Sequence, residues 1–309
     1  MIKFSVVIPL YNKEKDIAQT IKSVLNQNYK ADEIIVVDDG STDNGVKVVQ
    51  KTFEDKVKVV SQKNLGVSMA RNRGMDKAKN EYICLLDGDD LWEENFLEEI
   101  QRLITNYPDA LFYSTAHKYI DEKGNVVKGK VSFSREYTGL IENFIETFSN
   151  NYALVNSSSV CVKKSSGVLF PKNEKRGEDI CVWLRLGLKG SLAFSAKPLS
   201  IYRLNASNRS ATVHKEAILP CPIKWFYENQ QELKEHKQYK SLKKFIYTNI
   251  FIIVYGGFSL SKNYVSIDAV IQLMKKNRDL FYILLYPAYL VPVGLLEFIK
   301  KIRRRLRWP

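Results

Sequence analysis

Three carboxylates lie within four residues at the end of one apolar run. Residues 82–86, YICLL, are followed directly by Asp87, Gly88, Asp89 and Asp90. Carboxylates this close repel one another and resist desolvation, so we expect a cation opposite them. Gly88 allows the chain to turn here, so that two carboxylates can bind one divalent ion. Oxygen ligands suit Mg²⁺ or Mn²⁺, and such ions are usually shared with phosphate oxygens. The alternative is a solvated acidic turn in which Asp90 caps the next helix.

Two further polar groups follow the same kind of pattern. Asp38 and Asp39 come directly after the strand-like segment 33–37, EIIVV, and Asp39 has the position of an acid that accepts hydrogen bonds from a base N–H or a ribose hydroxyl. Arg71 lies in the segment NLGVSMARNRG, and an arginine that faces a crevice binds a base carbonyl or a phosphate. Each also has a simpler interpretation, a turn for the acids and a solvated side chain for the arginine.

The elements that position these residues alternate along the chain. Runs typical of buried strands at 4–8, 33–37, 57–60 and 82–86 are separated by segments with helical spacing of apolar residues. This order predicts an α/β fold with a doubly wound, mostly parallel sheet, whose ligands bind at the carboxyl ends of the strands. After about residue 110 the pattern is mixed, with strands around a Gly124–Asn125 turn, a helix over 139–148, a helix from 178 and a strand from 192.

Composition limits the remaining function classes. The chain has 309 residues, 45% of them hydrophobic, which is enough for a sizeable core and a second, smaller unit. Its four cysteines form no CxxC pair, which favours buried thiols in a reducing cytosol, and its three histidines lack the spacing of a zinc site. The N-terminus has no features of a signal peptide. The net charge of +13 is concentrated late, ending in KKIRRRLRWP, which indicates an anionic surface rather than nucleic acid.

Six segments together resemble a known family. In chain order they are FSVVIPLYN, SVLNQNY, EIIVVDDGSTDN, NLGVSMARNRG, YICLLDGDD and GEDICVWLRL. Over about residues 3–210 the chain resembles the inverting family 2 glycosyltransferases, which have the Rossmann-like GT-A fold. The resemblance is specific for the family and much less so for the sugar.

The resemblance implies roles for individual residues. Pro9, Tyr11 and Asp39 would hold the uracil and ribose of a nucleotide sugar, with Arg71 nearby. Asp87 and Asp89 would form the DxD motif, and Asp89, with Asp90, would ligate the metal on the diphosphate. Asp179 would be the general base, although capping of its helix is the simpler interpretation of its position. Glu178 and Trp183 would lie on the acceptor side, and Arg203 would reach the diphosphate.

These roles predict a metal-dependent, inverting hexosyltransferase. The donor would be a nucleotide sugar, UDP-linked, and the acceptor a saccharide attached to a lipid, as in bacterial surface-polysaccharide synthesis. No QxxRW motif follows the GED segment, so we expect transfer of one sugar per encounter. The alternatives are a non-catalytic nucleotide-sugar-binding scaffold of the same fold and a nucleotidyltransferase, although PLYNKEKD supplies no glycine-rich phosphate loop.

The resemblance does not extend over the last third of the chain. We therefore expect a catalytic domain at 1–214 and a helical, amphipathic region at 215–309. Segments 245–258 and 280–299 are apolar and aromatic, but the second contains Pro287, Pro292 and Glu297. We expect these helices and the basic tail to lie on the cytoplasmic face of the inner membrane. A hairpin dipping into the bilayer and ordinary core helices are the alternatives.

Overall fold

A computed structural model describes the chain except residues 122, 129–131, 175, 205–218, 253–263 and 286–309. It contains two compact units, Met1–Glu174 with Glu178–His214, and Lys175–Gly177 with Lys215–Pro309. The expected division between residues 214 and 215 falls outside the described residues and stays a prediction. The two units are described separately below.

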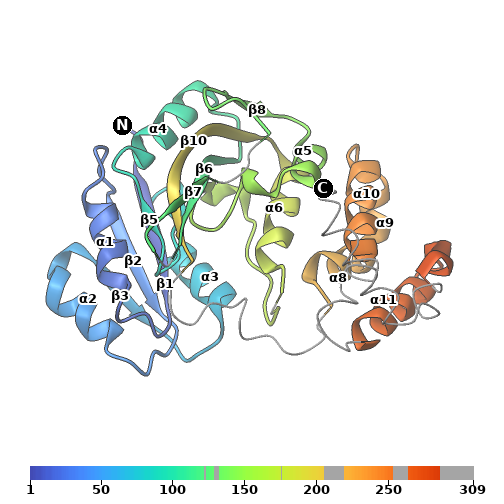
Figure 1. Cartoon of the computed structure of the whole chain (residues 1–309), viewed down its shortest axis with the longest axis horizontal. Coiled ribbons are helices and arrows are strands. Elements are labelled where there is room, and N and C mark those ends of the chain that lie inside the picture. Colours follow the sequence, from blue (N-terminus) through green and yellow to red (C-terminus); the bar gives the residue numbers. More distant parts are fainter. Residues whose placement is uncertain (122, 129–131, 175, 205–218, 253–263, 286–309) are drawn as a thin grey trace. The chain divides into compact units, whose positions relative to one another are not determined.

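The first unit contains a sheet with helices on both faces (Figure 1). Its strands are β1 (Phe4–Leu10), β2 (Glu33–Asp38), β3 (Lys58–Ser61), β4 (Tyr82–Leu85), β5 (Leu91–Trp92), β6 (Phe112–Ile120), β7 (Val126–Lys128), β8 (Thr138–Ile141), β9 (Val160–Lys163) and β10 (Leu192–Arg203). Its helices are α1 (Ile17–Leu25), α2 (Gly45–Phe53), α3 (Val67–Lys77), α4 (Phe96–Asn106), α5 (Phe144–Asn150) and α6 (Glu178–Lys189), with short 3₁₀ turns at Glu54–Lys56, Tyr152–Leu154 and Lys164–Ser166.

The described strands form one sheet in the order β3-β2-β1-β4-β9-β6-β10-β5, with β7 paired to β6 and β8 to β10. The first four are parallel, so β1, β2 and β4 end at the same edge. Strand β9 then enters antiparallel, and β6 and β10 are parallel to each other. The predicted α/β class and the convergence of the acidic strand ends are confirmed. The later, mixed part of the sheet corresponds to the change of pattern after residue 110.

Strand β1 is buried on both faces, as a central parallel strand must be. Its residues Phe4, Val6, Ile8 and Leu10 belong to the core that includes apolar residues of α1, α2 and α4. On the other face Val7 packs against α3, where a Cβ at Gly74 would lie 2.2 Å from Val7 Cγ1. Gly74 therefore allows α3 to approach the sheet closely, which brings Arg71 on the same helix to the strand ends.

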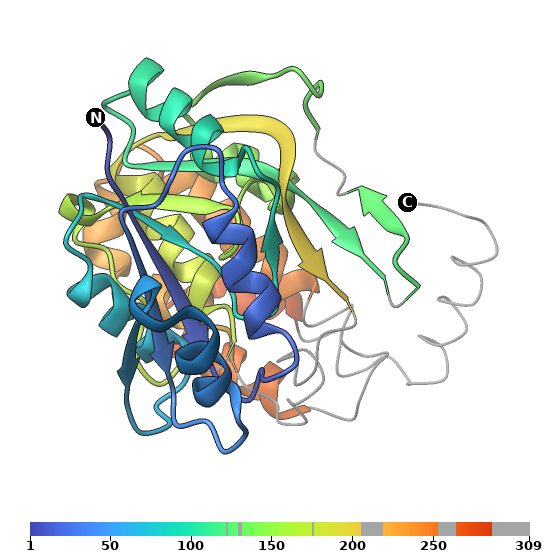
Figure 2. The same cartoon turned by 90° about the vertical axis from the view of Figure 1, so that its left-hand side faces the viewer.

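Strand β10 bends as it crosses the sheet. Its pairing with β6 shifts register between Ser195 and Pro198 and again before Ser200. Such irregularities increase local twist and bend a strand. The curve of β10 is clear in Figure 2, where it is the long yellow strand. The bend carries Arg203, at the end of β10, to the loop that contains Asp90.

The predicted helix over 139–148 is wrong in its first part. Residues Thr138–Ile141 form β8, which pairs antiparallel with β10, and α5 begins only at Phe144. Leu140 is exposed and Ile141 buried, the alternation of a strand with one solvated face. The pairing with β10 is a tertiary contact, so local spacing did not indicate it.

The second unit is helical in its described part. It comprises α8 (Cys221–Glu228), α9 (Gln230–Lys234), α10 (Tyr239–Phe251), α11 (Tyr264–Lys276) and a 3₁₀ segment at Leu280–Leu285. Its buried residues include Phe226, Phe245, Ile246, Val270 and Met274. Within it, Asp279 accepts hydrogen bonds from Tyr227 and Tyr247. Among the described helices, none is both long and apolar enough to span a bilayer.

The two apolar segments of the last third are only partly described. Helix α10 covers the start of 245–258, and Leu280–Leu285 covers the start of 280–299. The rest of both segments, and the basic tail at 300–309, lie outside the described residues.

Candidate functional site

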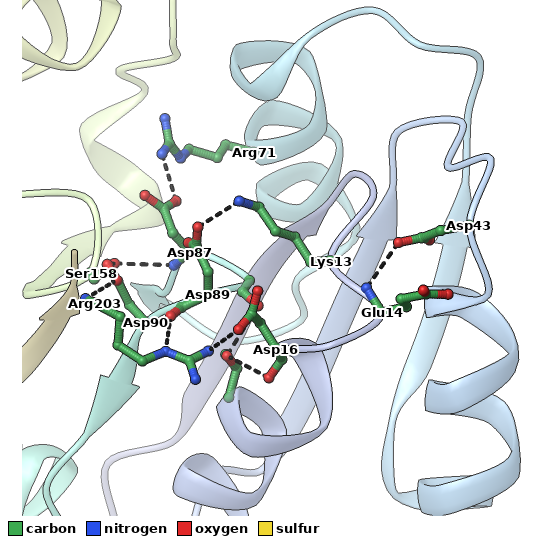
Figure 3. A network of polar contacts seen from close by, with 12 residues as sticks. Lys13, Glu14, Asp16, Asp43, Arg71, Asp87, Asp89, Asp90, Ser158 and Arg203 are labelled. Carbon is green, nitrogen blue, oxygen red and sulfur yellow. Dashed lines mark hydrogen bonds and ion pairs between the residues drawn. The ribbon is translucent and has the colours of Figure 1, made fainter. Parts of the chain in front are cut away.

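Each acid of the 87–90 turn has its own partner within the protein (Figure 3). Arg71 Nη2 lies 2.6 Å from Asp87 Oδ1, and Lys13 Nζ lies 2.6 Å from Asp89 Oδ2. The cations come from α3 and from the segment after β1, so the turn is neutralised by segments distant in sequence. This arrangement separates the carboxylates and lowers their mutual repulsion.

Asp90 is 1% exposed and points into the protein rather than into solvent. Its Oδ2 accepts a 2.5 Å hydrogen bond from Ser158 Oγ, and its Oδ1 accepts one from the backbone N–H of Arg203. Burial, with the charges of Asp87 and Asp89, raises the pKa of Asp90 well above its usual value. These contacts tie the turn to β10. The chain continues into β5, and α4 begins at Phe96, so Asp90 does not cap a helix.

Asp89 is the more accessible of the two expected metal ligands. Burial and the charge of Asp87 raise its pKa, and the hydrogen bond from Lys13 opposes that rise. Among the residues that the structure describes, no three His, Cys, Asp or Glu side chains converge as metal ligands. An ion enclosed by three or more such side chains does not fit these residues, and an ion at Asp89 would need further oxygen ligands from a substrate. Lys13 would have to move for such an ion to reach Asp89 Oδ2.

Arg71 is 4% exposed and lies at the centre of the anionic groups. Besides Asp87, its Nη1 lies 4.0 Å from Glu178 Oε1, and its guanidinium lies 5.0 Å from the centre of the Phe170 ring. Neither Nε nor Nη1 has a hydrogen-bond partner within the described residues. Buried N–H groups are nearly always paired, so these two donors are suited to an anionic or carbonyl ligand.

Glu178 and Asp179 form the first turn of α6. Asp179 Oδ1 accepts a 2.7 Å hydrogen bond from the N–H of Ile180. Burial raises the pKa of Asp179, while that hydrogen bond and the charge of Arg71 lower it. Burial and the charge of Asp179 likewise raise the pKa of Glu178. A helix N-terminus favours an ionised carboxylate, but here burial is the larger effect, so the pKa of Asp179 is above the normal value and not below it.

Asp39 is buried and fully bonded to the segment before α3. Its Oδ1 accepts from Gln62 Nε2 at 2.7 Å and from the N–H of Leu65 at 2.8 Å, and its Oδ2 accepts from the N–H of Gly66 at 2.9 Å. The Asp39 carboxylate therefore holds the segment that leads into α3 in place. Its contact with a base or ribose stays a prediction.

Pro9 and Tyr11 lie at the end of β1. Pro9 is buried in the strand, and a Cβ at residue 88 would lie 2.8 Å from its carbonyl oxygen, so Gly88 is required for the acidic turn to approach β1. Tyr11 is exposed at the edge of the sheet and is accessible to a ligand. The contacts expected of both with a nucleotide are untested.

The loops after β1 and β2 are joined by hydrogen bonds. Asn12 Oδ1 accepts from the N–H of Thr42, and Asn12 N–H donates to Ser41 Oγ. The N–H of Glu14 donates to Asp43 Oδ2 (Figure 3). Asn12 has a φ of 52°, a conformation that asparagine tolerates better than most residues. These contacts fix the position of Lys13 between them.

Arg203 lies beside the turn, where the resemblance placed it, but its guanidinium is bonded within the protein. It pairs with Asp16 at 3.1 Å and donates to the carbonyl of Asp89 (Figure 3). It also donates to Gln19 Oε1 at 2.8 Å. Lys13, Ser158 and Asp16 were not expected from the sequence as site residues. One feature of the sequence could have indicated Lys13 as a site residue: it is a cation two residues after Tyr11, at the end of a strand.

A cavity of 340 Å³ opens beside Asp179. Asp179 lines it, and so does Trp183, one of the two residues that were expected on the acceptor side. Glu178 instead faces Arg71. Asp179 thus lies between the charged cluster around Arg71 and a second, largely aromatic space.

Known proteins resemble this chain in sequence and in fold. An uncharacterised glycosyltransferase of Rickettsia bellii is 33% identical over 67% of this chain and 29% of its own length. The glucosyltransferase WfaP of Escherichia coli, named for UDP-Glc and α-D-GlcNAc-diphosphoundecaprenol, is 30% identical over 69% of this chain and 82% of its own. The crystal structure of TarS residues 1–349 from S. aureus with UDP-GlcNAc matches with a TM-score of 0.73 at 19% identity, over 98% of this chain and 92% of that one.

The match to the first of these relatives is partial, because the chain spans about a third of the length of the Rickettsia proteins. The family model described as "Glycosyl transferase family 2" matches residues 5–176, more than half of the chain. This range contains β1 to β9, the acidic turn and Arg71, and it ends just before Asp179. The chain therefore belongs to glycosyl transferase family 2.

Proposed function

We propose that this protein transfers one hexose from a UDP-linked sugar to a saccharide acceptor, with inversion at the anomeric carbon. The observation that carries the proposal is the position of Asp179. It lies between a cluster of charged groups at the ends of parallel strands and a cavity that can admit an acceptor. A base must stand between donor and acceptor in a direct displacement.

The reaction needs one proton transfer and one bond exchange. The acceptor hydroxyl gives its proton to Asp179, and its oxygen forms a bond to the anomeric carbon while the bond from that carbon to the diphosphate breaks. The nucleoside diphosphate leaves with the bonding electrons. Asp179 must be ionised to act, and the nearby Arg71 cation favours that form.

Arg71 is the residue best suited to the donor's negative charge. It is buried and fixed by Asp87, and two of its N–H groups have no hydrogen-bond partner within the described residues. Donors that need not reorganise stabilise developing charge most effectively. Tyr11 and Asp39 would hold the nucleoside end, and Arg203 would reach the diphosphate only after exchanging its present partners.

A divalent ion, Mn²⁺ or Mg²⁺, fits Asp89 as part of this proposal. When bound, it would neutralise charge on the leaving diphosphate. Asp89 would hold it, with Asp87 adjacent, whereas Asp90 has both oxygens bonded within the protein. We therefore propose Asp89 as the ligand in preference to Asp90.

The relatives support the choice of substrates. WfaP is named for a UDP-sugar donor and a lipid diphosphate-linked acceptor, AmsB of Erwinia amylovora is named for amylovoran biosynthesis, and TarS was crystallised with UDP-GlcNAc. We propose a UDP-sugar donor and a lipid-linked saccharide acceptor, in bacterial surface-polysaccharide synthesis. A catalytically inactive scaffold of the same fold would bind the donor without turning it over. A nucleotidyltransferase would release inorganic pyrophosphate rather than UDP.

Donor turnover tests the proposal directly. Release of UDP from a panel of UDP-sugars should occur with Mn²⁺ or Mg²⁺ and be lost with EDTA, with an acceptor saccharide supplied if hydrolysis alone is too slow. Asp89→Ala should lose this metal-dependent release of UDP, whereas Arg73→Ala, on the exposed face of α3, should behave as wild type. Failure of UDP to bind with or without metal would exclude the glycosyltransferase.

The role of Asp179 predicts a pH profile. Because the pKa of Asp179 is raised, the basic form is present only above that raised value, and kcat/KM should fall on acidification at a higher pH than a normal aspartate, near 3.9, would give. Asp179→Asn should reduce turnover about 10²- to 10⁴-fold at every pH and leave UDP affinity intact. Glu178→Gln is the matched comparison, and a greater loss there than in Asp179→Asn would make Glu178 the base.

Lys13 should compete with the metal for Asp89. Its ammonium group contacts the carboxylate oxygen that an ion needs, so Lys13→Met is expected to bind Mn²⁺ more tightly than wild type, by about tenfold, in calorimetric titrations without nucleotide. Asp89→Asn in the Lys13→Met protein should remove the gain. Equal Mn²⁺ affinity with and without Lys13 would mean that the ion does not use Asp89.

We also propose that the second unit brings the enzyme to the cytoplasmic face of the inner membrane. Its described residues include exposed apolar side chains at Phe251, Ile252, Leu280, Ile283 and Leu284. A groove of 540 Å³ is lined by three lysines of α10, Lys240, Lys243 and Lys244. Its aromatic lining residues are Tyr247, Phe251 and Phe281. Apolar surface beside lysines suits an interface with anionic headgroups.

Flotation with lipid vesicles tests this attachment. The full chain should bind vesicles containing phosphatidylglycerol and bind pure phosphatidylcholine weakly, and binding should weaken as salt increases. Replacing Lys240, Lys243 and Lys244 with Glu should weaken it, whereas Lys30→Glu, in the first unit, should not. Equal binding to both vesicle types would exclude attachment through charge.

A further inference from the structure

A short segment between β9 and α6 contacts Arg71. Residues 167–171 form neither helix nor strand, and Phe170 within them is 2% exposed. The centre of the Phe170 ring lies 5.0 Å from the guanidinium carbon of Arg71 on α3 and 6.1 Å from the ring centre of Trp183 on α6, with the two rings at 84°. One aromatic ring therefore contacts both helices that contribute charged residues to the site.

The backbone of Phe170 is held by the side chain of Asn72. Asn72 Nδ2 donates to the Phe170 carbonyl at 2.8 Å, and Asn72 Oδ1 accepts from the Phe170 N–H at 2.8 Å. A carboxamide carries both a donor and an acceptor, so it gives Phe170 the two partners that a neighbouring strand would otherwise supply. The position of this residue outside the sheet therefore depends on one side chain of α3.

Arg71 and Asn72 are consecutive in α3 and meet the same phenylalanine in different ways. Successive residues of a helix point about 100° apart, so Arg71 reaches Asp87 at the strand ends while Asn72 reaches the backbone of Phe170. The hydrogen bond to Asp87 uses one nitrogen, Nη2, and lacks the fixed geometry of a bidentate pair. A guanidinium that also lies against an aromatic ring loses the freedom to turn about that single bond.

We propose that Asn72 and Phe170 are positioning residues of the donor site: Asn72 holds Phe170 in place, and the Phe170 ring fixes the plane of the Arg71 guanidinium. Neither residue has to touch a substrate. The ring also keeps water from one face of the guanidinium, and a charge acts more strongly on its neighbours where water is excluded. The inference rests on the proposed role of Arg71 toward the negative charge of the donor.

A double-mutant cycle with UDP as the ligand tests this arrangement. Asn72→Leu keeps the size of the side chain and removes both hydrogen bonds, so in calorimetric titrations of the full chain it should weaken UDP binding by about fivefold. Phe170→Leu removes the ring itself and should weaken UDP binding by a similar factor. In an Arg71→Met background neither substitution should cause a further loss, because the guanidinium through which they act is absent.

Arg185→Met is the matched control. Arg185 Nη1 donates to the carbonyl of Leu169 at 2.9 Å, so this substitution removes a bond to the residue next to Phe170 and leaves both bonds of Asn72 in place. It should leave UDP affinity unchanged. A loss of UDP affinity equal to that of Asn72→Leu would assign the effect to the stability of the whole segment and overturn the inference.

The outcomes separate this inference from the function on which it rests. Failure of the wild-type chain to bind UDP overturns the proposed function itself. If wild type binds UDP but Asn72→Leu binds it equally well, or loses as much affinity with Arg71→Met as without it, the inference is wrong and the donor site stands. Circular dichroism checks that each variant is folded. Should Arg71→Met fail to fold, Arg71→Lys replaces it in the cycle, because it keeps the counter-charge of Asp87 and removes the planar group that Phe170 covers.

Discussion

The ion pair of Arg71 with Asp87 is the constraint on which the rest of the site depends. A guanidinium that is 4% exposed cannot be left without a counter-charge, and a carboxylate beside two others cannot be left without a cation. The ion pair gives each of these groups its counter-charge, and it holds α3 to the end of β4. Glu178 and Asp179 on α6 lie within the field of the same cation. One buried charge therefore contacts or influences α3, the acidic turn after β4 and the start of α6.

The remaining cations of the site have a different character. Lys13 and Arg203 bind Asp89, Asp16 and a backbone carbonyl through side chains long enough to exchange partners. Arg71 has no such freedom, because Phe170 covers its guanidinium and Asp87 holds one edge. The donor binding and product release that we propose would use both kinds of cation. The fixed one sets the geometry, and the movable ones adapt to the charge that arrives.

Sequence patterns predicted the parts of this protein that local spacing determines. The strands before residue 86 and the convergence of their polar ends follow from apolar runs and alternation, and they placed Asp39, Asp87 and Arg71 at one edge of the sheet. The partners could not be predicted in the same way. Lys13 meets Asp89 across 76 residues and Ser158 meets Asp90 across 68, and no periodicity encodes such pairs. Strand β8 was missed for the same reason, since it exists through its pairing with β10.

The aromatic cavity beside Asp179 shows the same limit. The resemblance led us to expect Trp183 on the acceptor side, but nothing in the sequence around His117, which also lines the cavity, indicated that it belongs to a site. Burial raises the pKa of the Asp179 carboxylate. Arg71 keeps the ionised form accessible. A carboxylate between an apolar cavity and a buried cation is both more basic than a solvated one and still able to ionise, and these are the two properties that the general base we propose would need.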